Sequence, residues 1–101
     1  MRKFGVTAWP DKTNYTIEVS GGDSADLHRL GPEEASEFLS CLVNILGGGK
    51  CDHESVHRIE SNQGDLYTVM LPTSECHTRV YIVSKRKLTE LKIALMGAIN
   101  G

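Results

Sequence analysis

Two short windows of the chain hold most of the residues that could bind a metal ion. Cys51, His53 and His57 lie in the first window, and Cys76 and His77 lie in the second. Structural zinc takes four nitrogen or sulfur ligands in a tetrahedron, so a Cys₂His₂ set drawn from two loops is chemically suitable. Neither window has the C-x₂₋₄-C spacing typical of such sites, which favours ordinary polar loop residues instead. A zinc-stabilised domain is therefore an alternative, and the main expectation is a protein without a cofactor.

A basic cluster is the second chemically distinctive feature, formed by Arg79, Lys85, Arg86 and Lys87. The last three are expected to open the final helix, where cations oppose the positive end of the helix dipole. An acidic partner offsets that cost, so these residues are candidates for partner binding.

The same region carries a resemblance to a known class of domain. From residue 32 the expected order is helix, three strands and helix, and the last helix opens with Ser84-Lys85-Arg86-Lys87. This outline is similar to that of double-stranded-RNA-binding domains, in which a basic helix start contacts phosphates. The resemblance implies a nucleic-acid-binding module as an alternative to a protein partner with an acidic surface.

Trp9 is the third candidate for partner binding. In a regular strand it faces away from Phe4 and Val6, which places it on the outer face of a sheet. A tryptophan there can anchor an interface or cover the edge of the core, and the sequence leaves both open.

The three cysteines, Cys41, Cys51 and Cys76, are an odd number at uneven spacing. Secreted disulfide frameworks usually have an even and denser set, so we expect reduced thiols in the cytoplasm, with a single disulfide as the alternative. Cys41 lies beside an apolar helical stripe and is expected to be a small buried hydrophobic residue.

Periodicity predicts the elements that position these residues. Alternating residues predict a hairpin, a short third strand and then a three-stranded meander, at 4–9, 15–20, 27–30, 55–61, 66–71 and 78–83. The last two strands are apolar on both faces, which is typical of central strands covered by helices on at least one side. Apolar stripes predict two helices, one from Pro32 to a left-handed Gly47 and one from the N-cap Ser84 to Ile99.

The predicted order is ββ(β)-α-βββ-α, without an internal repeat. It indicates an α+β fold in which two helices pack on a single antiparallel sheet of five or six strands, with residues 1–101 as one domain.

Charge and motifs narrow the function. A net charge of −2 excludes a globally basic nucleic-acid binder and a strongly acidic DNA mimic. No apolar run reaches the ~18 residues needed to span a bilayer, and no secretory signal is expected. Hydrolase, zinc-protease and nucleotide-binding motifs are missing, so we expect no enzyme. The remaining expectation is a small protein-binding module, such as an inhibitor, an immunity protein or a phage anti-defence regulator, that occludes a partner.

Overall fold

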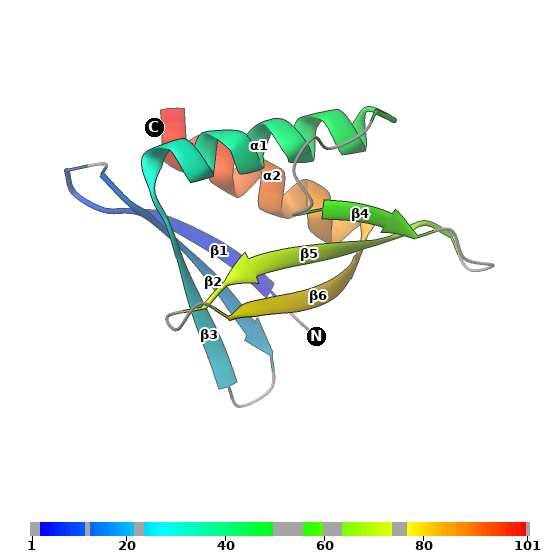
Figure 1. Cartoon of the computed structure of the whole chain (residues 1–101), viewed down its shortest axis with the longest axis horizontal. Helices are drawn as coiled ribbons and strands as arrows, with labels where there is room; N and C mark the ends of the chain where they lie inside the picture. The colour runs from blue at the N-terminus through cyan, green and yellow to red at the C-terminus, as the bar shows by residue number, and fades with distance from the viewer. Residues whose placement is uncertain are drawn as a thin grey trace.

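The computed structural model describes residues 3–11, 13–21, 24–49, 56–59, 64–73 and 77–100. Its elements are β1 (Lys3–Ala8), β2 (Tyr15–Gly21), β3 (Ser24–Leu30), α1 (Pro32–Leu46), β4 (Val56–Ile59), β5 (Leu66–Pro72), β6 (Thr78–Ser84) and α2 (Lys85–Asn100). The α+β class and the order of elements are confirmed. The single sheet is wrong, because β1–β2–β3 and β4–β5–β6 form two separate antiparallel sheets (Figure 1).

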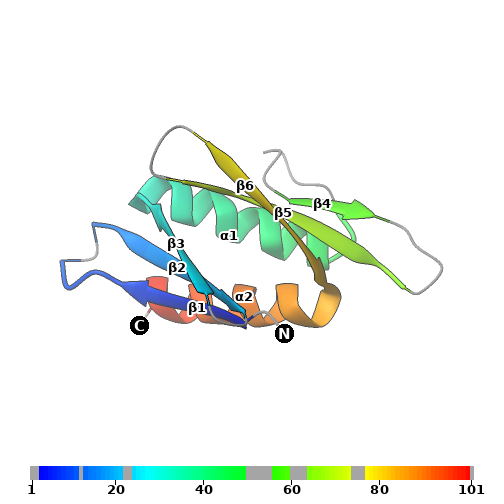
Figure 2. The ribbon, with the colours of Figure 1, turned by 90° about the horizontal axis from the view of Figure 1, so that it is seen from below.

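Each sheet buries one face beneath the helices, which lie side by side on one side of the molecule (Figures 1 and 2). The central strand of each sheet supplies three alternating buried side chains, namely Tyr15, Ile17 and Val19 from β2 and Tyr67, Val69 and Leu71 from β5. This period of two is what a strand with a single buried face requires.

The fold consists of two βββα units built on one plan, so the expectation that the chain has no repeat is wrong. Both central strands begin with Tyr-Thr, at Tyr15 and Tyr67, and both pair antiparallel with the strands before and after them. Buried residues of the helices repeat the same spacing of three and then four, at Ala35, Phe38 and Leu42 in α1 and at Leu88, Leu91 and Leu95 in α2. The repeat escapes sequence inspection because burial fixes the apolar character of a position and not its residue type.

The two units exchange their helices. Helix α2 of the second unit packs along β1 of the first unit, and α1 packs against β4 of the second. Strand β3 also lies against β5, and the two helices contact each other. Each sheet therefore depends on the other unit for part of its cover.

Local signals fix where the helices begin and end. The Ser84 hydroxyl accepts a hydrogen bond from the Lys87 amide at 3.3 Å, which confirms the predicted N-cap of α2. At the end of α1 the left-handed residue is Gly48, with φ of 91°, and not Gly47, whose φ is −83°. Gly47 still donates its amide to the Val43 carbonyl at 3.1 Å, so the chain leaves the helix one residue later than predicted. None of the helices in the described ranges is long and apolar enough to cross a membrane.

Cys41 is buried, as expected, but it is disulfide-bonded, so the expectation of a free thiol is wrong. Cys51 and Cys76, the other cysteines of the chain, lie outside the described residues. Counting cysteines gave the wrong redox state because a bridge needs only two residues that the fold brings together.

The exchanged helix provides a test of the fold. Leu95 is fully buried on α2, whereas Ile93 on the same helix is 62% exposed. We expect Leu95→Ala to lower the free energy of unfolding by about 2–5 kcal/mol, because it removes buried methyl groups and leaves a cavity. Ile93→Ala is the matched control and is expected to change it by less than about 0.5 kcal/mol. Urea unfolding of both variants measures the difference, and equal effects would contradict the packing of α2.

Candidate protein-binding surface

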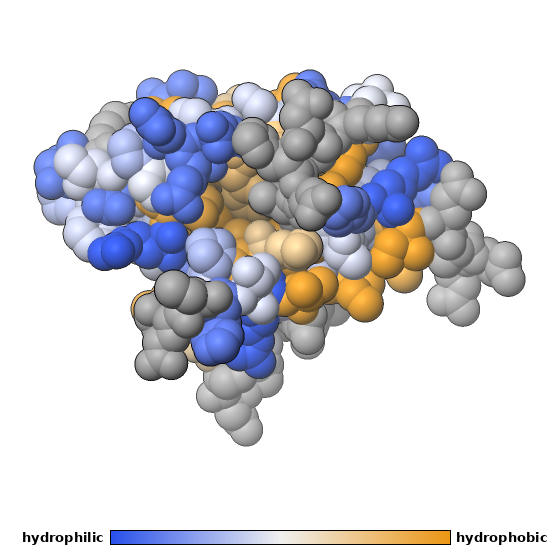
Figure 3. All heavy atoms as spheres, viewed as in Figure 1, coloured by the Kyte–Doolittle hydropathy of each residue, from blue (hydrophilic) through white to orange (hydrophobic). Residues whose placement is uncertain are grey.

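The outer face of the second sheet is apolar and exposed. Directly opposed residues of β4, β5 and β6 share this face, and its apolar members are Ile59, Leu66, Met70, Val80 and Ile82. We call this set the apolar outer face. Val80 is 53% exposed and Ile82 is 58% exposed, and neither described helix lies over them. Figure 3 shows hydrophobic side chains gathered over this part of the molecule.

This exposure corrects the prediction that both apolar strands are central and covered. Strand β5 is central in its sheet, but β6 is an edge strand. Burial within the described part of the chain therefore does not explain why Val80 and Ile82, on the outer face of β6, are apolar. Contiguous exposed apolar surface on a small protein is typical of an interaction site.

The first unit shows that the fold does not need apolar residues at these positions. When β2 is aligned with β5 and β3 with β6 by their strand registers, residues at the same position in the two units are counterparts. Glu18 is then the counterpart of Met70, and Arg29 is the counterpart of Ile82. Both units form the same three-stranded meander, and at these two positions the first has charged side chains and the second aliphatic ones, whereas Leu27, the counterpart of Val80, is aliphatic in both. The difference therefore reflects something other than folding.

The helix starts differ in the same way. Glu33 and Glu34 occupy the first turn of α1, where negative charge interacts favourably with the helix dipole. Helix α2 begins instead with Lys85, Arg86 and Lys87 and has no acidic residue in its first turn. Lys85 and Arg86 are exposed and have no ion pair with any described residue, so their charges are available to a partner. Lys87 pairs with Glu90 at 3.2 Å.

Trp9 lies on the outer face of the first sheet, as predicted, and is 39% exposed. Its indole N–H donates a hydrogen bond to the Thr16 hydroxyl at 3.1 Å, which fixes the ring against β2. In the following loop Asp11 accepts hydrogen bonds from the Thr13 hydroxyl and amide, and these lower the pKa of its carboxyl group. Trp9 thus belongs to the first unit, apart from the basic cluster and the apolar outer face.

Arg79 bonds within the chain. Its guanidinium forms an ion pair with Asp26 of β3 at 3.3 Å, so it joins the two units. Arg79 and Asp26 are counterparts, because Arg79 pairs with Leu71 in the second unit and Asp26 pairs with Val19 at the same position of the first. Arg79 is therefore partly committed to holding the fold together, which the sequence did not reveal.

A buried histidine continues this connection between the units. His28 is 1% exposed; its Nδ1 is 2.8 Å from the Pro72 carbonyl oxygen and its Nε2 is 2.6 Å from the Tyr81 hydroxyl. A carbonyl only accepts, so Nδ1 carries the proton and donates it. The Tyr81 hydroxyl also lies 3.4 Å from an Asp26 carboxylate oxygen, and in the neutral ring Nε2 accepts its proton across the shorter contact of 2.6 Å. His28 and Tyr81 are also counterparts, each one opposite the middle buried residue of its central strand.

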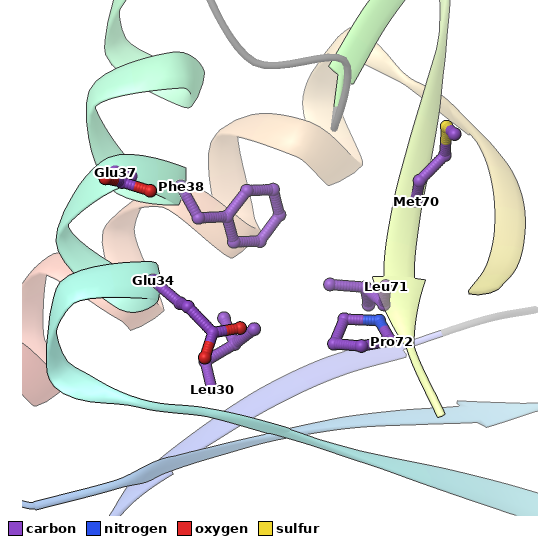
Figure 4. A pocket seen from close by; sticks show the side chains of 7 residues that line it. All are labelled: Leu30, Glu34, Glu37, Phe38, Met70, Leu71 and Pro72. Atoms are coloured by element: carbon purple, nitrogen blue, oxygen red, sulfur yellow. The ribbon is translucent and has the colours of Figure 1, made fainter. Parts of the chain in front are cut away.

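A pocket of about 200 Å³ lies between the start of α1 and the end of β5 (Figure 4). Phe38 and Leu30 approach it from one side, and Leu71 and Pro72 approach it from the other. The carboxylate of Glu34 points into the gap between them. Met70 and Glu37 complete the lining. No local pattern in the sequence identifies this pocket, because Leu30 and Phe38 of one wall lie far from Leu71 and Pro72 of the other in the sequence.

The register tests part of the proposed zinc set. His57 pairs with Thr68 in the sheet, whereas His77 accepts a hydrogen bond from the Thr73 amide beyond the end of β5. Five residues of strand separate these positions, or about 17 Å, so His57 and His77 cannot ligate one metal ion. Cys51, His53 and Cys76 lie outside the described residues, and within the described ranges no group of three potential ligands comes together.

The chain matches no protein-family model, no curated protein and no solved structure.

Substitution of Tyr81 tests the buried connection. Tyr81→Phe removes the hydroxyl that contacts both His28 and the Asp26 carboxylate, leaving the buried His28 nitrogen without a partner. We expect a loss of about 1–3 kcal/mol in the free energy of unfolding. Tyr67→Phe is the matched control, because Tyr67 is an equally buried tyrosine whose hydroxyl has no partner among the described residues. Chemical unfolding measures both, and equal losses would show that the His28 bond contributes nothing beyond packing.

Proposed function

We propose that the protein binds another protein through the apolar outer face and thereby blocks a surface of that partner. The observation that carries the proposal is the contrast between the two units. Positions that are charged in the first unit, Glu18 and Arg29, are Met70 and Ile82 in the second, although both units fold alike. Exposing aliphatic groups to water is unfavourable, and a partner that covers them recovers that free energy.

The basic start of α2 defines the chemistry of the partner. Lys85 and Arg86 follow directly on β6, so the apolar outer face continues into a positively charged margin. A complementary surface has an apolar centre and acidic groups on one side. A second copy of the chain fits less well, since two-fold pairing of this face brings the same cations near each other.

The mode of action is binding and not catalysis. The described residues hold one buried histidine, and both its ring nitrogens are engaged in structural hydrogen bonds. An inhibitor, an immunity protein or a phage anti-defence regulator has this character, and we propose a function of that type.

The cytoplasmic location expected from the cysteine count carries less weight in this proposal. The disulfide of Cys41 is of a kind that persists mainly in oxidising compartments. Labelling of thiols in host cells lysed directly into denaturant distinguishes the two locations, because the buried Cys41 then becomes accessible and is expected to be labelled only where it is reduced.

Substitutions on the apolar outer face test the binding site. We expect Val80→Thr with Ile82→Thr to weaken partner binding at least tenfold, since both side chains lose apolar contact area while retaining strand propensity. Leu27→Thr is the matched control, because Leu27 is the counterpart of Val80 and is 66% exposed in the first unit. Affinity capture from the native host identifies the partner, and calorimetric titration of that partner against each variant measures the change. Full binding by the double variant would overturn the assignment of this face.

Reversal of the basic charges tests the chemistry of the partner. We expect Lys85→Glu with Arg86→Glu to slow association with the captured protein about tenfold at low salt, with little difference at high salt where charges are screened. Stopped-flow or surface-binding kinetics measure the rates. A salt-sensitive mobility shift with RNA or DNA, abolished by the same variant, would instead support the nucleic-acid alternative.

A further inference from the structure

Strand β6 has a free edge. Strand β5 pairs with one side of β6, and no described strand pairs with the other side (Figure 1). Strand β3 packs against β5 and reaches β6 through side-chain bonds to Arg79 and Tyr81. Both residues lie opposite buried residues of β5, so these bonds are made from the inner face of the sheet. They leave the backbone edge of β6 unpaired.

The register shows which backbone groups face this edge. Antiparallel pairs alternate between residues that exchange backbone hydrogen bonds and residues that do not. The Thr73 amide bonds the His77 carbonyl at 2.7 Å, so the adjacent pair, Pro72 and Thr78, is of the second kind. The Pro72 carbonyl is consistent with this phase, because it accepts a hydrogen bond from the side chain of His28.

The same alternation continues along β6. Tyr81 exchanges its backbone hydrogen bonds with β5, whereas the N–H and C=O groups of Val80 and Ile82 point away from β5. No described residue bonds these outward groups. Val80 and Ile82 therefore present two features to a partner, namely exposed aliphatic side chains and backbone groups that are free to pair.

Other edge strands of the described chain have features that discourage strand addition. Helix α2 packs along β1, and β4 has only four residues. Strand β3 carries Asp26 and Arg29. Strand β6 has seven residues, and at its centre the outer face presents Val80 and Ile82 without a charge between them. It is the edge of the described chain that is best suited to accept another strand.

We propose that β6 accepts an extended segment of the partner protein as an added antiparallel strand. The inference rests on the proposed function and specifies how the partner is held. Main-chain hydrogen bonds to Val80 and Ile82 provide affinity, and aliphatic side chains of the segment pack beside theirs on the apolar outer face. Lys85 and Arg86 follow β6 directly, so the end of the segment beside them carries acidic residues.

A second copy of the chain is the less suitable occupant. Pairing of two β6 strands places Val80 and Ile82 of one copy beside those of the other, which enlarges the exposed apolar face instead of covering it. A different protein that supplies the strand can cover this face with the rest of its own surface.

Amide hydrogen exchange of the isotope-labelled protein tests the edge. In the protein alone we expect the amides of Val80 and Ile82 to exchange about tenfold or more faster than that of Tyr81, which is bonded to β5. The probe is the peptide acetyl-Glu-Glu-Val-Thr-Val-Thr-amide, whose valines lie opposite Val80 and Ile82 in antiparallel pairing. Saturating peptide is expected to slow both amides about fivefold, the factor that one net hydrogen bond provides.

Modified peptides separate strand addition from simple apolar contact. N-methylation of both peptide valines removes the donors that face β6 and is expected to abolish binding. N-methylation of both threonines alters the other edge of the peptide and is expected to leave binding unchanged. Replacement of Glu-Glu by Lys-Lys is expected to weaken binding about tenfold, because the peptide then brings cations to Lys85 and Arg86.

Substitution of Val80 tests the same edge from the side of the protein. Val80→Pro removes the outward N–H, and proline is tolerated at such a position of an edge strand. We expect it to abolish peptide binding, whereas the matched control Val80→Ala, which loses more apolar area, is expected to weaken it about threefold or less. Urea unfolding verifies that both variants fold, and the N-methylated peptides make the same test on the unaltered protein.

The outcomes distinguish this inference from the proposed function. Equal binding of the two N-methylated peptides, or no binding of the parent peptide, would overturn the added strand. Slow exchange of the Val80 and Ile82 amides that increases with protein concentration, without peptide, would assign the edge to a second copy and also overturn it. If the captured partner binds the Val80→Thr and Ile82→Thr double variant weakly but leaves both wild-type amides in fast exchange, the apolar outer face is its site without an added strand.

Discussion

The exchange of helices between the two units is the constraint on which the rest of the structure depends. A three-stranded sheet with one apolar face must bury that face against another element, and a single helix covers only part of it. In this chain α2 covers β1 and α1 packs against β4, so each unit supplies cover for the other. The arrangement brings β3 against β5 and produces the bonds between His28 and Tyr81 and between Asp26 and Arg79. These residues are counterparts in the repeat, so the polar contacts between the units join equivalent positions of the two third strands.

The repeat also makes it possible to separate folding from function within one chain. Where the two units agree, as at the apolar positions of β2 and β5, the fold itself accounts for the residue type. Where the two units differ, the fold is compatible with both residue types, so something other than folding determines which residue is present. The units differ at Glu18 and Met70 and at Arg29 and Ile82 of the outer faces, and at the helix starts, which are acidic in the first unit and basic in the second. This comparison within the chain supports the proposed binding face without any related sequence.

The elements were predictable from the sequence because they depend on local periodicity. The stripe from Ala35 to Leu46 and the alternation from Tyr15 to Val19 each require one buried face, and both elements form as expected. The number of sheets was not predictable in this way. Short connections favour neighbouring strands in one sheet, but here α1 separates β3 from β4, and the packing of α1 and α2 decides that the second set of strands forms a sheet of its own.

The site was less predictable than the fold, because much of it depends on how distant elements pack and not on local sequence patterns. Lys85 and Arg86 were recognisable because charge at a helix start is a local property. Exposure of Val80 and Ile82 was not recognisable, since apolar residues on both faces of a strand are also what a covered central strand contains. Two signals pointed to similar units, namely the Tyr-Thr that begins both central strands and the identical spacing of Ala35, Phe38 and Leu42 and of Leu88, Leu91 and Leu95.

The two helix starts have opposite charge, and the fold explains how one small chain can hold both. The start of α1 carries glutamates and the start of α2 carries lysines and arginine, so the molecule is acidic beside one sheet and basic beside the other. Glutamates at a helix start are favoured by the dipole, and the cations of α2 are not, which means that α2 gives up a small amount of stability at its first turn. The Ser84 cap and the fully buried Leu88, Leu91 and Leu95 hold that helix in place regardless. The shared core thus leaves the outer positions of each unit free to differ, and the differences between the units are where the binding chemistry is to be sought.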